Sequence, residues 1–130
     1  MKKKIIILST RSLTLNLFLK NIYNKFKNNG YTTYASCTDI HNLDKAFDKK
    51  ISVSFPFLQF KEIIKIFEFL KKFYYLFIFL KRHRDYIIFV HTPLASHLIR
   101  ICNFFLNIKI YYFVHGFRFH TKEKKIKYYI

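Results

Sequence analysis

The sequence predicts an α/β fold in which a Rossmann-like parallel sheet is flanked by helices. Short β-rich apolar runs alternate with stretches of helical apolar spacing along the 130 residues. Near the C-terminus, runs at 86–90 and 109–114 enclose a helical pattern at 94–106, which is the order of a βαβ unit with two parallel strands. Only two Gly and two Pro are present, and this scarcity of turn formers argues against an all-β fold.

The first third of the chain predicts a strand, a helix and a second strand. Residues 4–8 form a continuous β-branched run that is typical of a buried parallel strand. Ser12 is the expected N-cap of a helix at 13–29, and Gly30 is the expected left-handed residue after its end. The second strand is expected at 31–37. The apolar positions that predict the helix are Leu15, Phe18, Leu19, Ile22 and Phe26.

The middle of the chain predicts a loop, a short strand and a long helix. The polar stretch 38–50 is expected to be a loop with a short helical turn, and 51–55 a third strand that ends at Pro56. A helix is expected at 60–82. Its second half, 73–80, is apolar all round, so it must be buried or must contact lipid or a partner. With the βαβ unit, these elements predict the strand order 3-2-1-4-5.

Composition limits the possible partners without choosing one. Twenty-four Lys and Arg against seven Asp and Glu give a net charge of +17. This charge favours phosphorylated substrates, anionic lipid surfaces or nucleic acid, although AT-rich coding sequence also raises the Lys content. Cys37 and Cys102 lack metal or redox spacing, so both are expected to be buried thiols. No segment is long and apolar enough for a membrane span.

Two loops with histidine are expected at one edge of the sheet. His91 and Thr92 follow one predicted strand of the βαβ unit, and His115 and Gly116 follow the other. Because parallel strands end at the same edge, these residues should form one site, where ligands of open α/β sheets bind. The loop after the first strand opens a helix and is expected at the same edge. It is either an anion site or a capping loop, and its residues are Ser9, Thr10, Arg11 and Ser12.

Residues 91–119, which read HTPLASHLIRICNFFLNIKIYYFVHGFRF, resemble a stretch of the bacterial family 4 glycosyltransferases of capsule, exopolysaccharide and O-antigen synthesis. The shared pattern is His-Thr-Pro, then Val-His-Gly-Phe-x-Phe. The resemblance implies a GT-B fold, with two Rossmann-like domains facing each other across a cleft. It implies that residues 1–120 form an incomplete N-terminal, acceptor-side domain and that 121–130 are a basic tail where a further helix begins.

The resemblance also implies a reaction. A sugar would pass from a nucleotide sugar to a lipid-linked saccharide at the cytoplasmic membrane face. The chain alone is expected to be inactive, because in that family a second domain holds most of the nucleotide sugar. That domain would come from a partner chain, unless the chain is a truncated product. His115 is the catalytic candidate. The substrate-binding candidates are Ser9, Thr10, Arg11, His91, Thr92, Gly116, Phe117 and Arg118.

No cofactor is expected, and a metal site is disfavoured because the histidines lack the spacing of a helical metal pair. The alternative to an enzyme is a basic protein that binds a membrane surface or nucleic acid. Its basic runs are 2–4, 81–84 and 122–127. Nucleic acid is the less favoured partner, since the aromatic residues occupy core-like positions. This alternative requires the basic runs to form one patch, whereas the enzyme requires His91 and His115 to converge.

Overall fold

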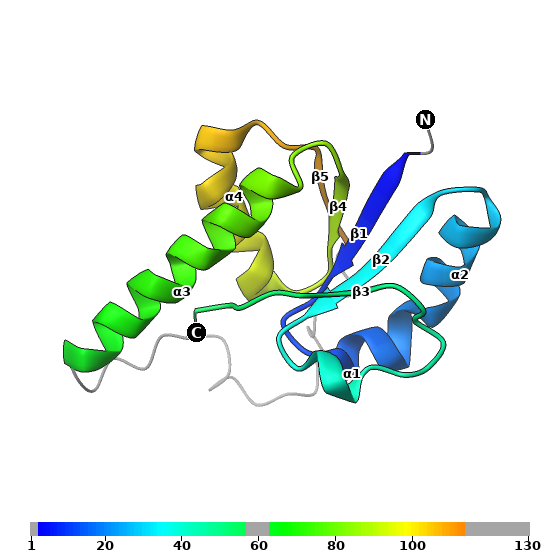
Figure 1. Ribbon diagram of the computed structural model, residues 1–130, viewed down its shortest axis with the longest axis horizontal. Coiled ribbons are helices and arrows are strands. Elements are labelled where there is room, and N and C mark those ends of the chain that lie inside the picture. The colour runs from blue at the N-terminus through cyan, green and yellow to red at the C-terminus, as the bar shows by residue number, and fades with distance from the viewer. Residues whose placement is uncertain (1–2, 57–62, 114–130) are drawn as a thin grey trace, which may run out of the picture.

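The computed structural model describes residues 3–56 and 63–113. Its centre is a five-stranded parallel sheet with the order β3-β2-β1-β4-β5 (Figure 1). The α/β class and the predicted strand order are therefore confirmed. The strands are β1 (Lys4–Leu8), β2 (Thr32–Cys37), β3 (Lys50–Ser52), β4 (Ile87–Val90) and β5 (Ile110–Tyr112).

Helices cover both faces of the sheet. The helix after β1 covers one face, and the helices after β3 and β4 cover the other (Figure 1). This division follows from right-handed crossovers, because connections that move in opposite directions along a sheet lie on opposite faces. The helical elements are α1 (Ser12–Thr14), the π-helical η1 (Leu15–Leu19), α2 (Lys20–Asn28), the 3₁₀ turn η2 (Ile40–Asn42), α3 (Ile63–Arg82) and α4 (Pro93–Leu106).

The central strand β1 supplies apolar side chains to both layers of the core. Ile5 and Ile7 pack toward α2, and Ile6 and Leu8 pack toward α3 and α4. All four are at most 1% exposed. A strand that is buried on both faces must be apolar at every position, which accounts for the continuous run in the sequence.

The helix after β1 differs from its prediction in two details. The π-helical segment η1 inserts an extra residue per turn, so Leu15, Leu19 and Tyr23 are buried while Phe18 is 61% exposed. The inward position predicted for Phe18 was therefore wrong. The N-cap is Arg11, and Ser12 is the first helical residue. Gly30 follows the helix with φ of 83°, which confirms the predicted left-handed glycine.

The connection from β2 to β3 is more ordered than its polar sequence predicts. Phe47 is buried at 1% exposure against the ring of Tyr23. The Tyr23 hydroxyl donates a hydrogen bond to Asp48, and Lys27 Nζ lies 2.9 Å from Asp48 Oδ2. Burial raises the pKa of Tyr23 to about 12, and the hydrogen bonds from Tyr23 and Lys27 lower the pKa of Asp48 to about 2. These contacts fix the segment to α2 without a long helix.

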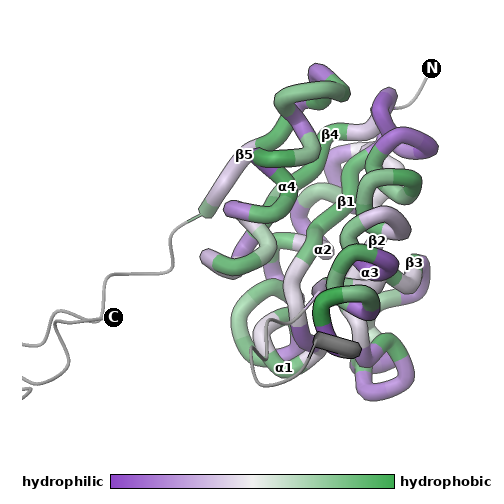
Figure 2. Tube along the Cα trace, turned by 90° about the vertical axis from the view of Figure 1, so that its left-hand side faces the viewer, coloured by the Kyte–Doolittle hydropathy of each residue, from purple (hydrophilic) through white to green (hydrophobic). Residues whose placement is uncertain are grey.

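Helix α3 is buried on one side only. Leu76 and Leu80 are 0% exposed in the core, whereas Tyr74 and Tyr75 on the outer side are 60% and 53% exposed. The apolar stretch 73–80 is thus explained in part by burial against the sheet. The N-terminal half of α3 extends beyond the sheet (Figure 1), and the trace of this helix carries both hydrophobic and hydrophilic residues (Figure 2). Among the described residues, no helix has both the length and the apolar character that crossing a membrane requires.

Candidate functional site

The loops after β1, β2 and β4 meet at the carboxyl end of the sheet. The His91 amide donates to the Leu8 carbonyl at 3.0 Å, so β1 and β4 stay paired to their last residues. The Thr10 amide donates to Thr92 Oγ1 at 3.3 Å and ties the two following loops together. The predicted convergence of His91 and Thr92 with the loop after β1 is therefore present in the structure.

Burial separates the candidate residues into two levels. Ser9 and His91 are 0% and 4% exposed and form the floor of the site. Thr10 and Thr92 are partly exposed, and Arg11 is exposed. A ligand at the surface would therefore meet the outer three residues first.

The floor of the site is held by aromatic packing. The His91 ring stacks on the Phe113 ring, with 5.4 Å between centroids and 18° between planes. Phe113 follows β5, and its amide donates to the Val90 carbonyl at 2.9 Å. Ser9 Oγ is buried and has no hydrogen-bond partner among the described residues. Such a buried hydroxyl is uncommon, because unpaired polar groups are costly away from water.

Asp39 is a member of this site that the sequence did not reveal. A lone aspartate after a strand is ordinarily solvated, and nothing beside it in the sequence sets it apart. Instead its Oδ1 accepts a hydrogen bond from the Ser12 amide and its Oδ2 accepts one from Ser12 Oγ, both at 2.7 Å. Burial alone would raise the pKa of Asp39, but the hydrogen bonds from Ser12 outweigh it, and the pKa lies below its ordinary value. The carboxylate thus satisfies the first turn of α1.

The same position explains the state of Cys37, which lies two residues before Asp39. Burial, followed by the negative charge of Asp39, raises the pKa of Cys37 to about 12. Burial raises the pKa of Cys102 to about 11. Both thiols are buried, as predicted, and with these raised pKa values they stay protonated near neutral pH, so neither is an activated nucleophile. In the described part of the chain, no group of three or more His, Cys, Asp or Glu residues could hold a metal ion.

The second half of the predicted site lies outside the described residues. This applies to His115, Gly116, Phe117 and Arg118, and to the predicted tail at 121–130. The placement of His115 beside His91 therefore stays a prediction. Strand β5 is parallel to β4, and it ends beside the carboxyl end of β4, where Phe113 contacts His91.

No family model and no curated protein matches the chain. Among solved structures, the chain is similar to the C-terminal domain, residues 83–215, of a hydrogenase from Pyrococcus furiosus. The TM-score is 0.56, with 12% identity over 87% of this chain and 94% of that domain. Identity at this level supports the α/β fold alone.

Proposed function

We propose that this chain is the acceptor-side part of a glycosyltransferase that moves a sugar from a nucleotide sugar to a lipid-linked saccharide in surface polysaccharide synthesis. The observation that carries the proposal is the hydrogen bond between the Thr10 amide and Thr92 Oγ1. It joins the His-Thr-Pro loop, on which the family resemblance rests, to the loop that follows β1. Residues 82 positions apart in the chain thereby form one surface.

The place of this surface in the sheet supports a ligand-binding role. Strands β1 and β4 are neighbours, and the chain order reverses between them. Open α/β sheets bind ligands outside the carboxyl ends of their strands at such a reversal. Arg11 is exposed there and would pair with the diphosphate of an acceptor, while the partly exposed Thr10 and Thr92 would meet its sugar.

The remaining roles come from the resemblance. His115 would be the catalytic group, and Gly116, Phe117 and Arg118 would line the acceptor cleft with it. The nucleotide sugar would be held together with a second domain, on this chain or on a partner chain. The acceptor would be reached at the inner face of the cell membrane. Exposed apolar side chains on α3, 53% for Ile66 and 70% for Phe67, support a peripheral contact with that surface.

Binding of the acceptor tests the proposal directly. The chain is titrated with a polyprenyl-diphosphate-linked saccharide in detergent micelles and, separately, with nucleotide sugars. We expect the saccharide to bind and the nucleotide sugars to bind weakly. Arg11→Gln should weaken saccharide binding by about tenfold, because it removes one charge-assisted hydrogen bond.

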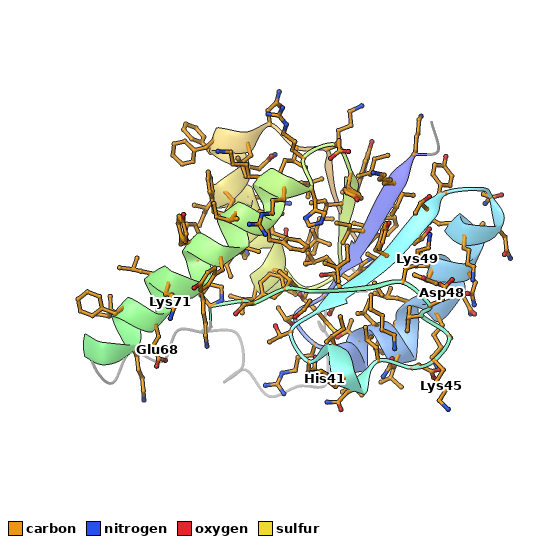
Figure 3. All side chains as sticks on the ribbon, in the orientation of Figure 1. His41, Lys45, Asp48, Lys49, Glu68 and Lys71 are labelled. Atoms are coloured by element: carbon orange, nitrogen blue, oxygen red, sulfur yellow. The ribbon has the colours of Figure 1, made fainter. Side chains whose placement is uncertain are left out.

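Lys45→Gln is the matched control for this experiment. Lys45 is exposed on the loop after η2, and its replacement removes the same charge away from the β4 loop (Figure 3). It should bind the saccharide as the unchanged chain does. Equal losses in Arg11→Gln and Lys45→Gln, or tight binding of a nucleotide sugar without the saccharide, would contradict the proposal.

One observation favours the alternative of a basic binding surface. Lys3, Lys4 and Arg84 belong to two basic runs that are far apart in the sequence, yet they line the same cavity. The third run, 122–127, lies outside the described residues. Residues of two of the three basic runs therefore meet at the amino end of the sheet, whereas His91 and Thr92 lie at its carboxyl end.

A further inference from the structure

The amino end of the sheet contains a cationic cavity that the acceptor site does not use. Its volume is about 300 Å³, and it lies where β1, β4 and β5 begin. We propose that this cavity binds a phosphate group. The residues that carry the argument are Lys3, Lys4, Arg84, Asp85, Asn107 and Lys109.

Three separate segments bring the charges together. Lys3 precedes β1 and Lys4 begins it, Arg84 lies between α3 and β4, and Lys109 precedes β5. The register places these strand starts side by side, because Ile5 pairs with Ile87 and Ile88 with Ile110. Lys4 Nζ lies 5.0 Å above the Tyr86 ring, and this cation–π contact holds its charge at the cavity.

The positive charge in the cavity is poorly compensated. Four of its lining side chains are cationic and one, Asp85, is a carboxylate. The salt bridges among the described residues join Lys20 to Asp44 and Lys27 to Asp48, and neither pair lines the cavity. A phosphate accepts hydrogen bonds on several oxygens at once, so it suits donors that approach from different elements.

Helix dipoles do not account for this cluster. Helices α3 and α4 both end here, and cations near helix C-termini are favourable. That effect explains Arg84, which follows the last turn of α3. It does not explain Lys4, which begins β1, or Lys3 just before it, nor the cavity itself. Asn107 adds an amide at the rim, and its φ of 49° is the left-handed conformation that Asn tolerates best after Gly.

The phosphate could be free or could belong to a lipid headgroup. Asn107 lines the cavity, and the last turn of α4 just before it presents Phe104 and Phe105, which are 86% and 74% exposed. Two exposed phenyl rings next to a cationic cavity match an interface with anionic lipid, where rings enter the acyl boundary and cations meet phosphates. Both sources share the same phosphate chemistry.

Titration of the whole chain with inorganic pyrophosphate tests the cavity. The double variant Arg84→Gln, Lys109→Gln should bind pyrophosphate at least about tenfold more weakly, since it loses two charge-assisted hydrogen bonds. The double variant Lys71→Gln, Lys72→Gln is the matched control. It removes the same net charge from exposed positions on α3, and Figure 3 shows Lys71 on the half of that helix that extends from the sheet. Circular dichroism confirms that each variant is folded.

A second arm identifies the source of the phosphate. Phosphatidylcholine vesicles with and without phosphatidic acid are sedimented with the same variants and with Phe104→Ser, Phe105→Ser. We call Arg84 and Lys109 the cavity pair, and Lys71 and Lys72 the control pair. Free phosphate is the source if replacing the cavity pair weakens pyrophosphate binding and replacing the phenylalanines leaves vesicle binding unchanged. Lipid is the source if vesicle binding requires phosphatidic acid, the cavity pair and the phenylalanines.

The proposal is overturned if neither pyrophosphate nor vesicles bind. It is also overturned if replacing the cavity pair and replacing the control pair weaken the binding of both probes equally. The inference does not depend on the proposed glycosyltransferase activity. The two sites lie at opposite ends of the sheet, so the cavity pair should leave saccharide binding unchanged. Failure at one site is therefore distinguishable from failure at the other.

Discussion

The two ends of the sheet share strands β1 and β4 but carry different kinds of residue. At the carboxyl end, small polar residues bond to one another, as Thr10 does to Thr92 and Ser12 to Asp39. At the amino end, Lys3, Arg84 and other cations surround an open cavity. One end is held by a hydrogen-bond network, and the other concentrates positive charge.

Helix direction accounts for much of this difference. In a parallel α/β sheet the connecting helices run opposite to the strands, so helix N-termini gather at the carboxyl end and C-termini at the amino end. The carboxyl end therefore gathers backbone amides, of which those of Thr10 and Ser12 donate to Thr92 and Asp39. The amino end presents carbonyls, and it can attract an anion only through side-chain charge. The difference shows that part of the net charge of +17 has a definite place in the fold.

The largest expected effect is the loss of stability when a buried side chain near the amino end of the sheet is shortened. Leu80 lies in the last turn of α3 and is 0% exposed, whereas Phe104 in the last turn of α4 is 86% exposed. Leu80→Ala should lower the free energy of unfolding by about 2–5 kcal/mol, because it removes buried apolar contacts and leaves a cavity. Urea denaturation with circular dichroism measures this change.

Phe104→Ala is the control for Leu80→Ala and should change stability by no more than about 0.5 kcal/mol, as exposed substitutions do. A loss above about 2 kcal/mol in Phe104→Ala would mean that this ring is covered, and the lipid source proposed for the phosphate would then lose its support.

The next effect compares one carboxylate at each end. Asp39→Ala should cost about 1–3 kcal/mol, because the Ser12 amide and hydroxyl lose a charged acceptor. Asp85→Ala should change stability by less than about 0.5 kcal/mol, since Asp85 is exposed and forms no salt bridge among the described residues. Equal losses in the two variants would remove the distinction between the ends.

The pH dependence of stability tests the same carboxylate. The pKa of Asp39 is lower in the folded chain than its ordinary value of 3.8. Its contribution is therefore present above that value and is lost as the pH falls through the folded pKa. Between about pH 5 and about pH 2, the unchanged chain should lose more stability than Asp39→Asn. Parallel stability curves for the two proteins would show that the network does not hold this charge.

The architecture of the sheet was predictable because it follows from local patterns. The strand order, Gly30 after the first helix and the helix that begins at Pro93 all come from short-range signals of apolar runs, turn formers and caps. The meeting of His91 with the loop after β1 was also predictable, because parallel strands end at one edge whatever their side chains are.

Features that depend on tertiary contacts were not predictable. Asp39 bonds to Ser12 across 27 positions, and nothing near it in the sequence distinguishes it from a solvated carboxylate. The π-helical segment turns Phe18 outward, although its spacing fits the apolar face of a regular helix. The cationic cavity appears only when the register brings Lys4 beside Tyr86, so the separate basic runs did not reveal it.

The smallest expected effect is electrostatic, and it compares one cation at the amino end of the sheet with one at the carboxyl end. Arg84 shares its cavity with Lys3, Lys4 and Lys109, whereas Arg11 lies exposed at the carboxyl end. Two like charges roughly 8 Å apart in water repel by about 0.5 kcal/mol, and salt screens this repulsion. Raising the ionic strength should therefore stabilise the unchanged chain, and Arg84→Gln should reduce that gain by a few tenths of a kcal/mol. Arg11→Gln should leave the gain unchanged.

Urea denaturation of the three proteins at low and high sodium chloride measures the difference. If Arg11→Gln reduced the gain as much as Arg84→Gln, the charge would be spread evenly over the surface, and the cavity would have no special attraction for phosphate.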